Sequence, residues 1–167
     1  MYRPTALATV LLAAIVGQSP PPERALVGTW ELLSRIDRDS SGHVLSETSL
    51  GSAPIGYLIY DAAGHVAAQL SGRDRTGLVC DSSGVSPDPN NNANIGGYSA
   101  YFGRYQVDLR AGTVTHILDG ALSAADVGKR LWRRFHVVGD TLTISFEPLS
   151  PDRGRRTRTV VWHRISP

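Results

Sequence analysis

The amino-acid sequence predicts an all-β fold, either a sandwich or a closed barrel of about nine short antiparallel strands. In most segments apolar and polar residues alternate with a period of two, as side chains do along a strand. Glycine and proline are frequent, with 17 and 10 among 167 residues, as expected for many turns. Most connections are short, which favours antiparallel neighbours. The length suits one domain with a substantial core.

The first four strands are expected before the middle of the chain. The first spans residues 27–36, and one of its faces carries Trp30, Leu32, Ser34 and Ile36. A polar turn at 37–42 and a weak second strand at 43–48 follow. The third and fourth strands span residues 55–60 and 65–70, joined by a turn at 61–64.

Residues 71–95 interrupt this pattern, because they are rich in glycine, aspartate, asparagine, serine and proline. Unstructured loops beyond about 12–15 residues are uncommon in compact domains and often serve as lids. Two interpretations stay open. A short helix could begin near Asn91 and carry Tyr98 and Tyr101 toward the mouth of a barrel, or the segment could be a disordered insertion. The single cysteine, Cys80, lies here among turn-forming residues and is interpreted as an incidental, partly buried thiol.

A hairpin over residues 97–118 is the centre of the predicted sheet. Its more apolar face carries Tyr101, Tyr105 and His116. Further strands are expected at 131–137, 142–146 and 157–165. Arg133 lies on the inner face of the first of these three. Val160, Trp162 and Arg164 share a face of the last.

Several short motifs, in this order, carry a resemblance to a known family. They are Leu26-Val-Gly-Thr-Trp-Glu-Leu32, Gly56-Tyr-Leu-Ile-Tyr60, Ala100-Tyr-Phe-Gly-Arg-Tyr105, Gly112-Thr-Val-Thr-His116, Arg133-Arg-Phe135, Gly139-Asp-Thr-Leu142 and Val161-Trp-His-Arg164. The chain resembles the bacterial and fungal lipocalin-like domain family, which has a calycin-type β-barrel. The resemblance implies an up-and-down antiparallel barrel of about 8–9 strands over residues 25–167, with one long loop or short helix as a lid. It also implies that Trp30 and Arg164 form a structural pair, in which the guanidinium stacks on the indole.

The N-terminal residues 1–24 are interpreted as a signal peptide followed by a proline-rich linker. Residues 6–16 are mostly apolar, but a membrane span needs about 20 such residues. We therefore expect a secreted or periplasmic protein with no membrane span in its mature form. No Ala-x-Ala cleavage site is present, so a retained anchor is the alternative.

Composition and motifs narrow the possible partners. The formal net charge of +2 and the lack of a sustained basic face argue against nucleic-acid binding. The five histidines show no ligand spacing, so no metal site is expected. The sequence also has no cofactor-binding motif, and it leaves the oligomeric state open.

The expected ligand-binding residues are Tyr60, Tyr101, Tyr105, His116 and Arg133. Apart from Arg164, Arg133 is the one permanently charged residue expected on an inner face, where it would select a small, mainly apolar ligand with an anionic or carbonyl oxygen. A simpler interpretation has Arg133 in a salt bridge at the rim and His116 bonded to a tyrosine or a backbone carbonyl.

Three functions remain open from the sequence. The first is an exported protein that binds a small molecule in its barrel. The second is an enzyme of isomerase or cyclase type, with His116 as general acid or base and a tyrosine such as Tyr105 as hydrogen-bond donor. The third is a structural or interaction module whose barrel is filled by side chains.

Overall fold

The computed structural model describes residues 22–46, 49–76, 86, 88–148 and 155–167. Within these residues the chain forms nine strands and two short 3-10 helices. The strands are β1 (Gly28–Asp39), β2 (Val44–Leu45), β3 (Ile55–Tyr60), β4 (His65–Ser71), β5 (Tyr98–Asp108), β6 (Thr113–Ala121), β7 (Arg130–Val138), β8 (Thr141–Phe146) and β9 (Arg156–Ser166). The helices are η1 (Pro22–Leu26) and η2 (Ala124–Asp126).

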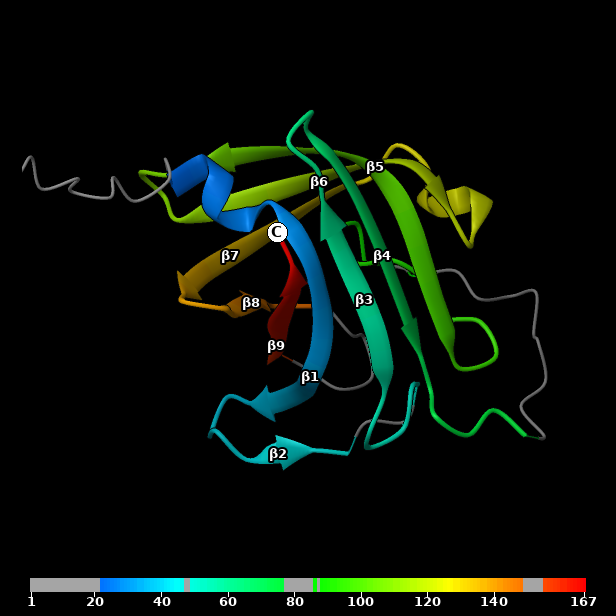
Figure 1. Ribbon diagram of the computed structural model, residues 1–167. Coiled ribbons are helices and arrows are strands. Elements are labelled where there is room, and N and C mark those ends of the chain that lie inside the picture. Colours follow the sequence, from blue (N-terminus) through cyan, green and yellow to red (C-terminus); the bar gives the residue numbers. More distant parts are fainter. Residues whose placement is uncertain (1–21, 47–48, 77–85, 87, 149–154) are drawn as a thin grey trace, which may run out of the picture.

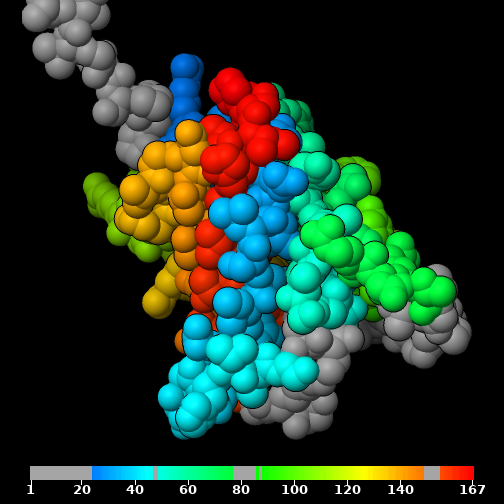
Figure 2. All heavy atoms as spheres, turned by 60° about the horizontal axis from the view of Figure 1, so that its bottom comes forward, coloured from blue at the N-terminus to red at the C-terminus, as the bar shows by residue number. Residues whose placement is uncertain are grey.

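All neighbouring strands are antiparallel, and β1 pairs with both β3 and β9, so the sheet closes on itself (Figure 1). Figure 2 shows β1 in blue between β9 in red and the teal strand β3. Eight strands form the barrel, and β2 adds a short extra pairing at the far end of β1. Closure leaves no free sheet edge within the barrel. The predicted all-β, up-and-down barrel is therefore confirmed.

The floor of the barrel lies where η1 meets β1. Trp30 is fully buried, and its Nε1 donates a hydrogen bond to the carbonyl oxygen of Leu26 at 2.8 Å. The guanidinium carbon of Arg164 lies 4.0 Å from the indole centroid. Arg164 also donates hydrogen bonds to the carbonyl oxygens of Ala25 and Val27. The structure thus places Trp30 and Arg164 in contact, where they hold η1 across this end of the barrel.

The alternation on β1 differs from the sequence expectation. The pairing of β1 with β9 shifts register between Leu32 and Ser34, and a bulge of this kind reverses which side chains face inward. Arg35 and Asp37 are buried, whereas Ser34 and Ile36 are only partly buried. The expectations that Ser34 and Ile36 share the inner face with Trp30, and that residue 37 begins a turn, are therefore wrong.

Two other expectations are corrected. No helix forms near Asn91 in the part of the chain that the structure describes; residues 88–97 make turns, and Tyr98 and Tyr101 lie on β5. Of the predicted second strand at 43–48, the described residues form a strand at Val44–Leu45, where they pair with the end of β1, and residues 47–48 lie outside the described part of the chain. Cys80 and residues 1–21 of the expected leader and linker (1–24) lie outside the described residues. No described helix has the length and apolar character to cross a membrane.

Candidate functional site

A cavity of about 60 Å³ lies between the inner faces of the strands and residues 91–94. This volume holds about four to six water-sized groups. Its wall has an apolar part and a polar part. The apolar side chains are Leu50, Leu58, Ala68, Leu70, Ile144, Phe146, Val160 and Trp162, and the polar ones are Arg35, Asn91, Asn92, Asn94, Ser99, Tyr101, His116, Arg133 and Arg158.

Positive charge is concentrated in this wall. Arg35, Arg133 and Arg158 are at most 8 % exposed. Burial, followed by the charge of Arg158, lowers the pKa of Arg35 to about 9, and burial lowers the pKa of Arg133 to about 10. Both groups therefore remain protonated at neutral pH. An uncompensated buried charge is costly, so this wall favours an anion in the cavity.

The buried carboxylate of Asp37 offsets part of the charge. Asp37 accepts hydrogen bonds from Nε and Nη2 of Arg158 at 2.6 and 2.8 Å, and it forms an ion pair with Arg156 at 3.4 Å. Burial opposes ionisation of Asp37, but the hydrogen bond and charge of Arg158 hold its pKa below the usual value. Asp37 does not line the cavity.

Arg133 has one side of its guanidinium engaged. Nη1 donates to the carbonyl oxygen and Oδ1 of Asn90 at 2.9 and 3.0 Å and to the carbonyl oxygen of Trp132 at 2.8 Å. The guanidinium carbon lies 3.6 Å from the ring centroid of Phe146. Among the described residues, Nε and Nη2 of Arg133 have no hydrogen-bond partner, so this edge of the guanidinium is available to a ligand. The partners of Nη1 are neutral oxygens, and the nearby charge of Asp88 offsets only part of the cost of burying Arg133.

His116 lies between two tyrosines. Its Nε2 is 2.7 Å from the hydroxyl oxygen of Tyr60, and its Nδ1 is 2.8 Å from that of Tyr101. Burial, aided by the charge of Arg133, lowers the pKa of His116 to about 3. Burial raises the pKa of Tyr101 to about 12 and that of Tyr60 well above its usual value. The imidazole and both phenols are therefore neutral at pH 7.

Not all of the predicted ligand-binding residues reach the cavity. Tyr101, His116 and Arg133 line it, whereas Tyr60 and Tyr105 do not. Tyr105 packs edge-on against Tyr60 with ring centroids 4.9 Å apart, and its hydroxyl donates to the carbonyl oxygen of Asp61.

Sequence reasoning missed two arginines of the site. Arg158 continues the alternation of Val160, Trp162 and Arg164, so extending that pattern by one step would have found it. The sequence pattern could not have identified Arg35, because the bulge between Leu32 and Ser34 reverses the alternation of side chains on β1. The expectation that Arg133 is the one charged inner residue besides Arg164 is therefore wrong.

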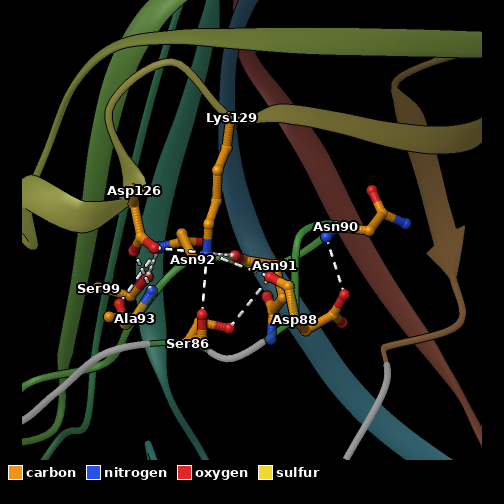
Figure 3. A network of polar contacts seen from close by, with 9 residues as sticks. All are labelled: Ser86, Asp88, Asn90, Asn91, Asn92, Ala93, Ser99, Asp126 and Lys129. Atoms are coloured by element: carbon orange, nitrogen blue, oxygen red, sulfur yellow. Dashed lines mark hydrogen bonds and ion pairs between the residues drawn. The ribbon is translucent and has the colours of Figure 1, made fainter.

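The segment over the cavity is held by a partly buried polar network (Figure 3). Nζ of Lys129 donates to the carbonyl oxygens of Ser86, Asp88 and Asn91 at 2.9, 3.1 and 3.1 Å. Lys129 also pairs with Asp126 at 2.7 Å. Lys129 and Asp126 both lie just before β7, and their contacts hold residues 86 and 88–93 over the cavity. We call residues 86 and 88–93 the lid segment.

Asp126 contributes a second contact to the lid segment. The backbone N–H of Ala93 donates to Oδ2 of Asp126 at 2.6 Å (Figure 3). The amide Nδ2 of Asn92 donates to Oγ of Ser99 on β5 at 2.6 Å. The lid segment is thus bonded to both flanks of the cavity.

The described part of the chain holds no group of three histidine, cysteine, aspartate or glutamate residues that could bind a metal ion. A family model described as a lipocalin-like domain matches residues 27–165. A search of the curated proteins gives no significant match.

Proposed function

Because the chain belongs to the lipocalin-like domain family, we propose that it binds a small, mainly apolar carboxylate inside its barrel. The barrel fits small-molecule binding in general. The proposal of a carboxylate rests on the open guanidinium edge of Arg133, in a cavity whose wall also includes eight apolar side chains. A carboxylate matches the fork of a guanidinium better than a neutral oxygen does.

The size of the cavity limits the ligand. About 60 Å³ is well below the 300–1,000 Å³ that is typical of sites for drug-sized molecules. With the lid segment closed, the ligand has about four to six non-hydrogen atoms. A branched carboxylate such as isobutyrate has this size and presents methyl groups to the apolar side of the wall.

The position of His116 favours binding over acid–base catalysis. Both ring nitrogens are within hydrogen-bond distance of tyrosine hydroxyls, so neither is free to contact a substrate directly. A general base works best when its pKa lies near the operating pH, and the pKa of His116 is about 3. The filled-barrel alternative is decided by the binding test below.

The test compares two probes of the same shape, isobutyrate and its neutral analogue isobutyramide. Titrations followed by backbone amide chemical shifts should give tighter binding of isobutyrate. Arg133→Met should weaken isobutyrate binding by about 1.5–3 kcal/mol, the scale of a charged hydrogen bond, or about 10- to 150-fold. Isobutyramide should bind the variant as it binds the wild type. Stability should hold or rise, because a buried charge is removed.

Arg134→Met is the matched control, because Arg134 is the next residue of β7 and its side chain is exposed. This variant should bind isobutyrate like the wild type. Equal affinity of the wild type for the two probes would contradict the role of Arg133. Failure of both probes to bind would favour the filled, structural barrel.

Export is the second part of the proposal, and it rests on the short apolar segment at residues 6–16. Cleavage by a signal peptidase should leave a mature N-terminus between about residues 18 and 24. Edman sequencing of protein isolated from fractionated native cells measures this directly. Intact Met1 in the soluble cytoplasmic fraction would refute export.

A further inference from the structure

The hydrogen bonds of His116 fix where its proton lies. A neutral imidazole has one donor nitrogen and one acceptor nitrogen. Both nitrogens contact tyrosine hydroxyls. One tyrosine therefore donates to the ring, and the other accepts from it.

Tyr60 must be the donor. It is 1 % exposed and does not line the cavity, and His116 is the one hydrogen-bond partner of its hydroxyl among the described residues. If Tyr60 accepted a proton from Nε2, its own hydroxyl hydrogen would be buried without an acceptor, at a cost of about 1–3 kcal/mol. Tyr60 therefore donates to Nε2, and the proton of the ring resides on Nδ1.

Tyr101 is left with a hydroxyl hydrogen to donate. Its oxygen accepts the Nδ1–H of His116, and within the described part of the chain this hydroxyl has no second partner. Tyr101 lines the cavity. Its hydrogen is thus available to an acceptor in the same small space that Arg133 borders.

Arg133 borders the same cavity as this hydroxyl. Burial raises the pKa of Tyr101, and the nearby charge of Arg133 opposes this rise. In a cavity of about 60 Å³, a ligand of a few atoms that contacts Arg133 is also within reach of Tyr101. The two residues can therefore offer donors to two different oxygens of one ligand.

We infer that the Tyr60–His116–Tyr101 chain makes Tyr101 a fixed hydrogen-bond donor and that the site selects short oxo-carboxylates over plain carboxylates. This inference rests on the proposed function, because Arg133 must hold the carboxylate for Tyr101 to meet the second oxygen. Tyr101 contacts the ligand in this scheme. Tyr60 and His116 are positioning residues, which act through the tautomer of the imidazole.

The binding test uses pyruvate and isobutyrate, which have the same charge, the same number of non-hydrogen atoms and a similar size. Where pyruvate has an oxo oxygen on a trigonal carbon, isobutyrate has a methyl group and a hydrogen on a tetrahedral carbon. The wild type should bind pyruvate about 3- to 10-fold more tightly, the effect of one neutral hydrogen bond. Tyr101→Phe should remove this preference. Tyr60→Phe should reduce it without altering the cavity wall, because the imidazole is then free to change tautomer.

Tyr105→Phe is the control for Tyr60→Phe, since Tyr105 packs on Tyr60 but bonds to the backbone of Asp61. It should keep the full preference for pyruvate. A long-range proton–nitrogen spectrum of the wild type should show His116 protonated on Nδ1. This measurement needs no variant to fold.

The outcomes separate the two proposals. Protonation of His116 on Nε2, or equal affinity for pyruvate and isobutyrate, would overturn the inference about Tyr101 and leave the carboxylate site in place. Binding of neither probe would overturn the proposed function itself.

Discussion

His116 should make the stability of the protein depend on pH between about 5 and 7. The imidazole is buried, and its pKa is lowered to about 3 by burial and by the charge of Arg133. In the unfolded chain a histidine has a pKa of about 6.5. As the pH falls below this value, the unfolded state takes up a proton that the folded state does not. The free energy of unfolding therefore decreases toward acid pH and is insensitive to this group above about pH 7.

The size of the effect follows from these two pKa values. Integration of the proton uptake from pH 7 to pH 5 gives a loss of about 2 kcal/mol, with a slope approaching about 1.4 kcal/mol per pH unit. For a chain of this size the melting temperature should fall by about 4–8 °C. The groups packed against the imidazole do not titrate in this range, because Tyr60 and Tyr101 have raised pKa values and Arg133 stays charged.

Urea unfolding, followed by tryptophan fluorescence at constant ionic strength, measures this loss at about pH 7 and pH 5. His116→Gln can keep hydrogen bonds to both tyrosines but cannot titrate, so most of the pH-dependent loss should disappear. His65→Gln is the control, because His65 is exposed and pairs with Asp61 at the surface. That variant should show the same loss as the wild type. If His116→Gln loses as much stability as the wild type between the two pH values, the reasoning is refuted.

Three further predictions concern the floor of the barrel, the ion pair of Asp37 with Arg158, and the lid segment. Trp30→Ala should lower the free energy of unfolding by about 3–5 kcal/mol. The control Trp132→Ala, at a residue that is 42 % exposed, should lower it by about 1 kcal/mol or less. Similar melting curves for the two variants would contradict the role of Trp30 in the floor of the barrel. Asp37→Asn should lower the free energy of unfolding in urea by about 3–5 kcal/mol, because Arg158 loses its buried carboxylate. A decrease of less than about 1 kcal/mol would contradict the stabilising role of this ion pair. Lys129→Met should speed amide hydrogen exchange in the lid segment by about tenfold or more and leave the exchange of β3 and β6 unchanged. Equal exchange rates of the lid segment in the variant and the wild type would show that Lys129 does not hold this segment.

The sequence by itself determined the strands and most of the inner face. Alternation with a period of two is a local property, because successive side chains of an extended chain point to opposite sides. It therefore placed His116 and Arg133 inside and could have placed Arg158 there as well. The expected contact of Trp30 with Arg164 came from the resemblance to lipocalin-like domains, and closure of the barrel accounts for it by bringing the first and last strands together.

The tertiary structure decided the features that depend on pairing between distant segments. The bulge in β1 is set by its register with β9, and it turns Arg35 and Asp37 inward against the local pattern. Tyr60 and His116 are 56 residues apart, and the hydrogen bond between them depends on the register of the strands that lie between them in the sheet. The volume of the cavity likewise depends on how the lid segment packs. Register, bulges and packing are settled by the whole closed sheet, so no window of sequence contains them.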